Sequence, residues 1–258
     1  GVSIAAIMPV DIPEEEWENV QIIFATSAGD VRRNALSDFT NVRANGKIAM
    51  DLPENVELVN ARIATQDDDV MLVTKSGRAI RFSTNAVRVF KGRKSTGVRG
   101  VRLTGDDCVV SMSILRHFEA SSDERAAYLK MRRAVAGMVD DEGAGTEDEE
   151  VSANATISPE RYAEMSAAEN LILTISSRGS GKLSSSHDYP VRGRGGMGVA
   201  AMDKAMRGGD LVASFPVDLE DQIMLATSKG QSIRVPIEGI SFRSRSAGGV
   251  KVFNTGKN

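Results

Sequence analysis

Four segments of this chain repeat one pattern at a nearly constant spacing. Each opens with a short apolar run that ends in a glycine turn, and the segments are 20–52, 70–103, 171–202 and 222–254. The turn glycines are Gly29, Gly77, Gly179 and Gly230. They are 48, 102 and 51 residues apart, and the middle spacing becomes 49 when the 53 residues of 117–169 are left out. A period of about fifty residues is typical of a propeller, a solenoid or an array rather than of one globular core.

Each repeat is composed of short strands. In the second repeat, the apolar run 70–74 and the alternating segment 78–82 flank the turn and predict a hairpin. A loop rich in Arg, Lys, Ser and Gly follows, and after a second glycine the segment 98–103 predicts a third strand. Fourth strands are predicted beside the hairpins, at residues 4–10, 56–64, 109–115 and 211–217. This pattern predicts an all-β fold, a β-propeller of about four-stranded blades, and its regularity argues against the alternative of a β-sandwich with similar turns.

Residues 117–169 interrupt the repeats and predict a helical and acidic insertion. Ser121 and Glu124 form a capping-box pattern, and an apolar stripe at helical spacing follows them. The stripe is Tyr128, Met131, Val135 and Met138. Ser158 as N-cap and Pro159 at the first helical position predict a second helix, and the acidic run 140–150 predicts disorder. The expected organisation is two blades in 1–116, the partly disordered insertion in 117–169 and two further blades in 170–258.

The net charge of −3 hides two opposed populations. The insertion holds 13 acidic and 5 basic residues, which leaves 22 acidic and 27 basic residues in the rest of the chain. These basic residues recur at related places in the repeats, so a propeller would array them around a curved edge. Such an edge fits a bent polyanion, and double-stranded DNA is the expected partner. The candidate DNA-binding residues are Arg32, Arg33, Arg43, Lys47, Arg81, Arg88, Lys91, Arg93, Lys94, Arg99, Lys182, Arg192, Arg194, Arg234, Arg243 and Arg245.

The basic loops contain no pattern for reading bases. Gly and Ser let the backbone approach phosphates without selecting a sequence, so binding is expected to follow the shape and deformability of DNA. Two alternatives stay open: the charges are only a solvated surface, or the propeller is a protein-interaction platform for acidic partners. The insertion, with its opposite charge, is a candidate competitor with DNA for these loops.

No catalytic or metal-binding residues are predicted, so a propeller enzyme is the least supported class. His117 and His187 are far apart in the sequence and have no companion ligands. The G-x-G-x-x-G pattern at 193–198 lacks the βαβ unit that a dinucleotide site needs. No apolar run approaches the ~18 residues of a membrane span. The single Cys108 excludes an intramolecular disulfide and fits a reducing, cytoplasmic location.

Several segments resemble the C-terminal domain of the DNA gyrase A subunit. The most specific are 70–77 and 96–103, and 24–39, 188–190 and 222–227 match the same family. The resemblance implies a β-pinwheel, a propeller-like disc whose blades exchange strands and whose edge wraps DNA. It also implies that the chain is a non-catalytic part of an ATP-hydrolysing type IIA topoisomerase that introduces negative supercoils. The implied partners are double-stranded DNA, the remainder of the gyrase A subunit, and the gyrase B subunit, assembled as a heterotetramer in the bacterial cytoplasm. The resemblance implies ATP and Mg for the holoenzyme and no cofactor for this chain.

The chain departs from the family pattern in two ways. Family members with full gyrase activity carry a Gln-Arg-Arg-Gly-Gly-Arg/Lys-Gly box in the first blade, and the nearest approach here is residues 192–198 in the third repeat. The sequence also contains four repeats where gyrase domains usually have six. Because the chain begins without Met, a missing N-terminal portion would explain both departures, and the C-terminal domain of the topoisomerase IV A subunit is the alternative assignment.

Overall fold

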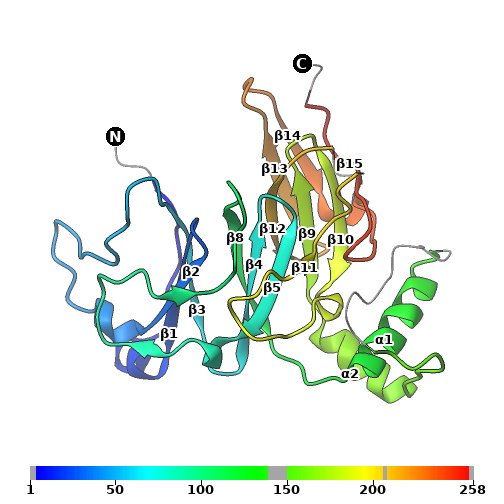
Figure 1. The fold of residues 1–258 in the computed structure, drawn as a ribbon, viewed down its shortest axis with the longest axis horizontal. Coiled ribbons are helices and arrows are strands. Elements are labelled where there is room, and N and C mark those ends of the chain that lie inside the picture. Colours follow the sequence, from blue (N-terminus) through cyan, green and yellow to red (C-terminus); the bar gives the residue numbers. More distant parts are fainter. Residues whose placement is uncertain (1–3, 139–149, 206–207, 256–258) are drawn as a thin grey trace. The chain divides into compact units, whose positions relative to one another are not determined.

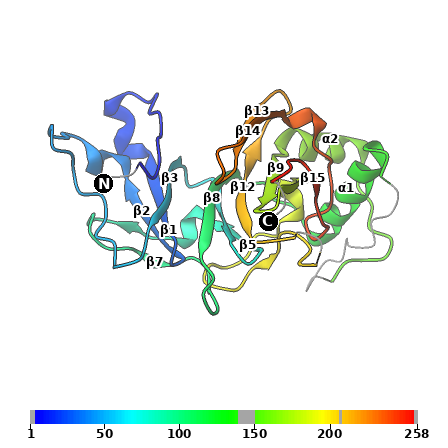
Figure 2. The ribbon, with the colours of Figure 1, turned by 90° about the horizontal axis from the view of Figure 1, so that it is seen from above.

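The computed structural model describes residues 4–138, 150–205 and 208–255, and these residues form two compact units built mainly from antiparallel sheets (Figures 1 and 2). The first unit comprises Gly1–Lys75, Ile80–His117 and Val191–Gly198. The second unit comprises Ser76–Ala79, Phe118–Pro190 and Val199–Asn258. Among the described residues, no helix has the length and apolar character needed to cross a bilayer.

The first sheet of the first unit is built around the hairpin of the first repeat. Its strands β1 (Gln21–Thr26) and β2 (Asp30–Ala35) turn at Gly29, whose φ is 89°, and β3 (Leu58–Ala64) pairs with the other edge of β1. The positive φ explains why a glycine recurs at this turn. The four central residues of β2 are all buried, and two of them are arginines. This strand therefore has protein on both faces and does not follow the alternation of a half-exposed strand.

Strands from the second repeat complete this sheet. β6 (Val89–Phe90) pairs with β2 in parallel, and β7 (Val98–Arg99) pairs with β2 antiparallel. The loop glycine Gly97 permits this crossing, because its φ is +99° and an added Cβ would lie 2.0 Å from the carbonyl oxygen of Val31. The exchange of strands between repeats is the arrangement that defines a pinwheel, although the predicted third strand 98–103 is paired only at β7.

The second sheet of the first unit contains β4 (Asp68–Thr74), β8 (Val109–Arg116) and the part of β5 (Arg78–Ser83) that begins at Ile80. Leu72, Phe82 and Met112 from these strands join a buried cluster with Ile23 of the first sheet. Residues 4–10 are not a strand, contrary to the expectation. They precede a 3-10 helix, and the short 3-10 helices of this unit are η1 (Glu14–Asn19), η2 (Leu36–Phe39) and η3 (Thr84–Ala86).

The second unit repeats the arrangement for the third and fourth repeats. Its main sheet has the order β12-β9-β10-β15, and the bounds are β9 (Leu171–Ser176), β10 (Ser180–Ser185), β12 (Leu211–Val217) and β15 (Val250–Lys251). β15 comes from the loop of the fourth repeat, so strand exchange recurs here. β11 (Val199–Ala200) pairs with Ala79 and Arg78. The remaining elements are the hairpin of β13 (Gln222–Ala226) and β14 (Ser232–Pro236) and the 3-10 helices η4 (Ser186–Asp188) and η5 (Ile237–Gly239). The predicted all-β propeller or pinwheel with a helical insertion is confirmed.

The insertion contributes two helices that lie side by side, α1 (Ser122–Val135) and α2 (Pro159–Ala168) (Figures 1 and 2). Ser121 and Glu124 form both bonds of the predicted capping box, and the hydroxyl of Ser158 accepts from the backbone N–H of Arg161. Of the predicted stripe, Tyr128 is buried, whereas Met131 and Val135 are exposed. The predicted acidic run lies outside the described residues except for Glu150.

The two helices are bound to the third repeat within the second unit. The Nε2 of His187 in η4 lies 2.7 Å from the carbonyl oxygen of Met165 in α2, so this nitrogen carries the proton and donates. The His187 ring meets the ring of Tyr128 edge-on at 5.0 Å, and the hydroxyl of Tyr128 donates to Glu169 at 2.7 Å. Glu169 also accepts from Arg132 at 3.2 Å. The described part of the insertion is therefore a packed element of this unit.

Candidate nucleic-acid interface

The structure divides the sixteen candidate cations into buried and solvent-facing groups. Five are buried: Arg32, Arg33, Arg81, Lys182 and Arg245. This corrects the expectation that these five cations lie on an outer edge, whereas Arg234 in the corresponding strand of the fourth repeat is exposed. In β2, β5 and β10 the central residues are covered on both faces, so the cations there end against backbone or, for Arg81, against a buried carboxylate.

Arg32 is fully buried beneath the loops of the first and second repeats. Its Nη1 donates to the carbonyl oxygens of Arg93 at 2.7 Å and Ser95 at 2.5 Å, and its Nη2 donates to the carbonyl oxygen of Ala49. The guanidinium carbon lies 4.8 Å from the ring centre of Phe24. Burial, followed by the nearby charge of Arg93, lowers the pKa of Arg32. The group remains charged because an arginine pKa starts far above neutrality.

Lys182 makes the corresponding contacts in the third repeat. Its Nζ donates to the carbonyl oxygens of Ser244 at 2.8 Å and Ala247 at 2.6 Å, and also to that of Arg245. The side chain has no exposed surface. An ammonium has three donors, and three carbonyls of the fourth-repeat loop accept them.

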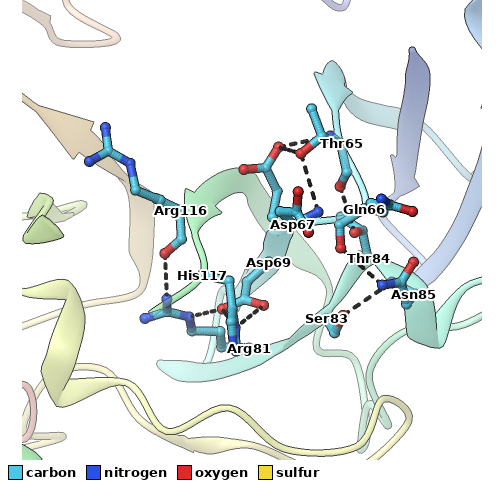
Figure 3. A network of polar contacts seen from close by, with 11 residues as sticks. Thr65, Gln66, Asp67, Asp69, Arg81, Ser83, Thr84, Asn85, Arg116 and His117 are labelled. Atoms are coloured by element: carbon cyan, nitrogen blue, oxygen red, sulfur yellow. Dashed lines mark hydrogen bonds and ion pairs between the residues drawn. The ribbon is translucent and has the colours of Figure 1, made fainter. Parts of the chain in front are cut away.

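Arg33 and Arg81 occupy the next position along the strand in the first and second repeats. Arg33 donates from Nη1 to the carbonyl oxygens of Thr84 and Val87, both at 3.1 Å, so it holds the η3 turn. Arg81 forms an ion pair of 2.9 Å with the fully buried Asp69, whose other oxygen lies 3.0 Å from Nδ1 of His117 (Figure 3). These contacts join strands and turns inside the first unit.

Arg245 is held in the second unit by Asp188. Its Nε donates to the carbonyl oxygen of Asp188 at 2.8 Å, and the Asp188 carboxylate accepts the backbone N–H of Arg245 at 2.7 Å. Burial raises the pKa of Asp188, and the charge of Arg245 opposes that shift. The side chain of Arg245 therefore organises the loop that carries it.

The remaining eleven candidates face solvent at least in part, and nine of them belong to three loops of the first unit. We call these nine the basic loop surface: Arg43, Lys47, Arg88, Lys91, Arg93, Lys94, Arg99, Arg192 and Arg194. Six of the nine are exposed, whereas Lys47, Arg93 and Arg192 are half-buried. The other two candidates, Arg234 and Arg243, lie in the second unit.

Backbone hydrogen bonds bring the three loops together. The N–H of Asp51 in the first loop donates to the carbonyl oxygen of Lys94 in the second, at 2.8 Å. The N–H of Gly195 in the third loop donates to the carbonyl oxygen of Gly100 at 2.7 Å. Arg194 also donates to the carbonyl oxygen of Arg99 at 2.9 Å. Arg102, a further cation of the second-repeat loop outside the sixteen candidates, is exposed, and its N–H donates to the carbonyl oxygen of Gly196 in the third loop at 2.8 Å.

The described residues offer no other obvious chemical site. Among residues 4–138, 150–205 and 208–255, no group of three or more His, Cys, Asp or Glu side chains is placed to hold a metal ion. In the network of Figure 3, the carboxylate of Asp69 binds Nε of Arg81 at 2.9 Å and lies 3.0 Å from Nδ1 of His117. The basic loop surface is therefore the best supported functional surface of the described structure.

Comparisons with known proteins identify relatives of the whole repeat region. The sequence profile of a family described as "DNA gyrase C-terminal domain, beta-propeller" matches residues 21–65, 68–116, 170–215 and 221–258. The DNA gyrase A subunit of Granulibacter bethesdensis is 45% identical over 265 residues, which cover 98% of this chain and 28% of the relative. The DNA gyrase A subunit of Rickettsia bellii is 39% identical over 254 residues, covering 97% of this chain and 27% of the relative. The chain thus spans about a quarter of the length of these relatives.

Solved structures show the same fold at low sequence identity. A crystal structure of the C-terminal domain of DNA topoisomerase IV has a TM-score of 0.67 at 18% identity, covering 96% of this chain and 60% of that one. A DNA gyrase A C-terminal domain has a TM-score of 0.62 at 19% identity, covering 92% of this chain and 62% of that one. Because the family profile matches all four repeats and more than half of the residues, the chain belongs to the DNA gyrase C-terminal domain family with its β-propeller fold.

Proposed function

We propose that this chain binds double-stranded DNA without sequence preference and bends or wraps it. The observation that carries the proposal is the basic loop surface, where three hydrogen-bonded loops of the first unit present nine cations. Membership of the gyrase C-terminal domain family supports the same function. A row of cations attracts phosphates at any sequence, and a deformable duplex meets more of them by bending toward the row.

The chemistry of the loops favours backbone contacts over base contacts. Within its described residues the first unit has 3-10 helices but no α-helix that could enter a major groove. Lys91 and Lys94 are exposed point charges suited to phosphate oxygens. Arg88 rests on the ring of Phe90, with its guanidinium carbon 3.6 Å from the ring centre, which holds its charge at the surface.

We extend the proposal to the longer proteins that the curated relatives represent. Joined to the remainder of a gyrase A subunit, and assembled with the gyrase B subunit, the chain would present wrapped DNA for ATP-dependent negative supercoiling in the bacterial cytoplasm. ATP and Mg would be bound by those other parts, and this chain would need no cofactor. The A subunit of topoisomerase IV is the alternative context, and the 31–45% identity to gyrase A subunits favours gyrase.

The first experiment measures DNA affinity against salt concentration. Six or more phosphate contacts should give log K against log salt a slope of about −5 or steeper. A triple variant with Lys91, Lys94 and Arg99 changed to Gln should make the slope less steep by about 0.9 for each phosphate that is no longer neutralised. The matched control changes three exposed cations outside the basic loop surface, Lys130, Arg178 and Lys229, and should keep the wild-type slope.

The second experiment tests wrapping. A plasmid relaxed by a type I topoisomerase in the presence of the chain should shift in linking number if the DNA is wrapped. Binding with no shift would reject wrapping. A flat salt response would reject DNA binding altogether and favour the second candidate, a platform for acidic protein partners, which the same exposed cations could serve.

A further inference from the structure

We propose that Arg32 is a positioning residue that holds the basic loop of the second repeat in its DNA-binding conformation, and that Lys182 does the same for the fourth repeat. The inference rests on the proposed function. Neither side chain reaches solvent, so neither contacts DNA itself. Each instead collects backbone carbonyls from the loop of the following repeat.

The contacts of β2 fix one side of the second-repeat loop. Asn34 donates to the carbonyl oxygens of Phe90 and Gly92, both at 3.0 Å, and Arg32 donates to those of Arg93 and Ser95. Four carbonyls within six residues are thereby turned toward β2. The side chains of Lys91, Lys94 and Arg99 from the same loop are exposed. Anchoring the carbonyls inward therefore presents these cations outward.

The equivalent position in the other repeats shows that a cation is not required to build the strand. The third residue after the turn glycine is Arg32, Ile80, Lys182 and Ile233 in the four repeats. An arginine in the interior costs solvation, as the lowered pKa of Arg32 indicates, and isoleucine avoids that cost. Unlike isoleucine, the cation supplies donors to the loop carbonyls.

The repeat that carries Ile80 uses a different anchor. Its partner loop is held by Arg194, which belongs to the loop itself and donates from Nε to the carbonyl oxygen of Ala86 at 2.8 Å. Nη1 of Arg194 donates to the carbonyl oxygen of Arg99 at 2.9 Å. There a loop cation is committed to backbone contacts. Arg32 and Lys182 perform this anchoring from the strand. In the loop that Arg32 holds, Arg93 donates to the carbonyl oxygen of Ile48 at 2.7 Å, whereas Lys91, Lys94 and Arg99 stay exposed for DNA.

The test combines local hydrogen exchange with DNA binding in the whole chain. Arg32→Ile introduces the isoleucine that repeats two and four have at this position, and Arg32→Lys introduces the lysine of repeat three. Loss of the Arg32 anchor should loosen the loop and speed amide exchange by about tenfold or more at residues 98–101 in Arg32→Ile, because these residues pair with β2 or donate to the carbonyl oxygen of Gly29. In Arg32→Ile the slope of log K for DNA against log salt should become less steep by about 0.9 for each phosphate that is no longer contacted. Arg32→Lys should restore most of the wild-type slope and most of the wild-type exchange protection.

Two controls separate positioning from general damage. Lys130→Gln removes one exposed charge from α1 and should leave both readouts unchanged. Lys182→Ile should speed exchange at 244–247 without affecting 98–101. Unchanged exchange at 98–101 in a folded Arg32→Ile protein would overturn the proposal, and so would faster exchange with an unchanged salt slope.

Other outcomes are also decisive. If Arg32→Ile does not fold by circular dichroism, Arg32→Lys carries the test. Wild-type exchange at 98–101 with a reduced salt slope in that variant would contradict the proposal, whereas wild-type values of both would support it. Failure of the wild-type chain to bind DNA would refute the proposed function itself. Normal wild-type binding with an unaltered Arg32→Ile slope would refute only the positioning role.

Discussion

Replacing Gly97 by alanine should separate the strand-exchanged loop from the first sheet. The φ of Gly97 is +99°, and an added Cβ would lie 2.0 Å from the carbonyl oxygen and 2.6 Å from the carbonyl carbon of Val31. Both neighbours are backbone atoms of β2, so a rotamer change cannot relieve the overlap. The loop must lift away, which breaks the pairing of Val98 with Val31 and of Arg99 with Asp30.

The expected loss can be assembled from three contributions. A non-glycine residue at positive φ costs about 1–2 kcal/mol. The broken β2–β7 pairing removes backbone hydrogen bonds that each contribute about 1 kcal/mol net. Exposing Val98, which packs against the first core cluster, adds roughly 1 kcal/mol. Gly97→Ala should therefore destabilise the first unit by about 3–5 kcal/mol, which is large for a single methyl group.

Gly46 provides the matched control because it has the same place in the first repeat. Its φ is +82°, but an added Cβ meets no atom within 4 Å. Gly46→Ala should cost only the conformational strain, about 1 kcal/mol after subtracting the stabilisation that comes from the lower conformational entropy of the unfolded chain.

Urea unfolding followed by the fluorescence of Trp17 measures both variants. This is the only tryptophan in the chain, and it packs against the cluster of Ile22 and Phe24 in the first sheet. Equal losses in the two variants, or a loss below about 1 kcal/mol in Gly97→Ala, would show that the close approach of the β2 backbone does not require a glycine at position 97.

Three further predictions concern the polar contacts of the two units. Tyr128→Phe should lower the free energy of unfolding of the second unit by about 1–2 kcal/mol, measured by thermal denaturation, because the hydrogen bond to Glu169 is lost. Burial raises the pKa of Tyr128 and Tyr189 above that of an unfolded tyrosine. Their contribution to the free energy of unfolding is therefore fully present below pH ~10 and is lost as the pH rises further. Absorbance at 295 nm should show both side chains ionising only when the protein unfolds in alkali. Asp69→Leu should cost about 3–5 kcal/mol by leaving Arg81 buried and uncompensated, and the double variant with Arg81→Met should cost less than the two single losses combined in a urea-unfolding cycle.

The regular features of the fold follow from local sequence. Apolar runs that end in a glycine turn predicted every hairpin, because strand periodicity and positive φ are properties of a few neighbouring residues. The capping residues Ser121 and Ser158 likewise predicted both helices of the insertion. Residues 4–10 were the exception, since an apolar composition alone does not supply a strand partner.

The candidate interface was only partly predictable. Repetition located the basic loops, and nine of their cations face solvent in the first unit. Repetition also selected Arg32 and Lys182, which are buried. Both lie within a hairpin strand beside apolar residues rather than in the glycine-rich loop, but Arg234 also lies within such a strand and is exposed, so this signal alone does not predict burial.

The number of repeats, their strands and the positions of their charges are thus readable from the amino-acid sequence. Which repeat completes which sheet, and which cations remain available, depends on tertiary pairing. Strand pairing across repeats joins residues more than sixty positions apart, such as Val31 and Val98, and no local pattern encodes that partner. Once β7 pairs with β2, the second-repeat loop covers Arg32, and this cation binds loop carbonyls instead of a ligand.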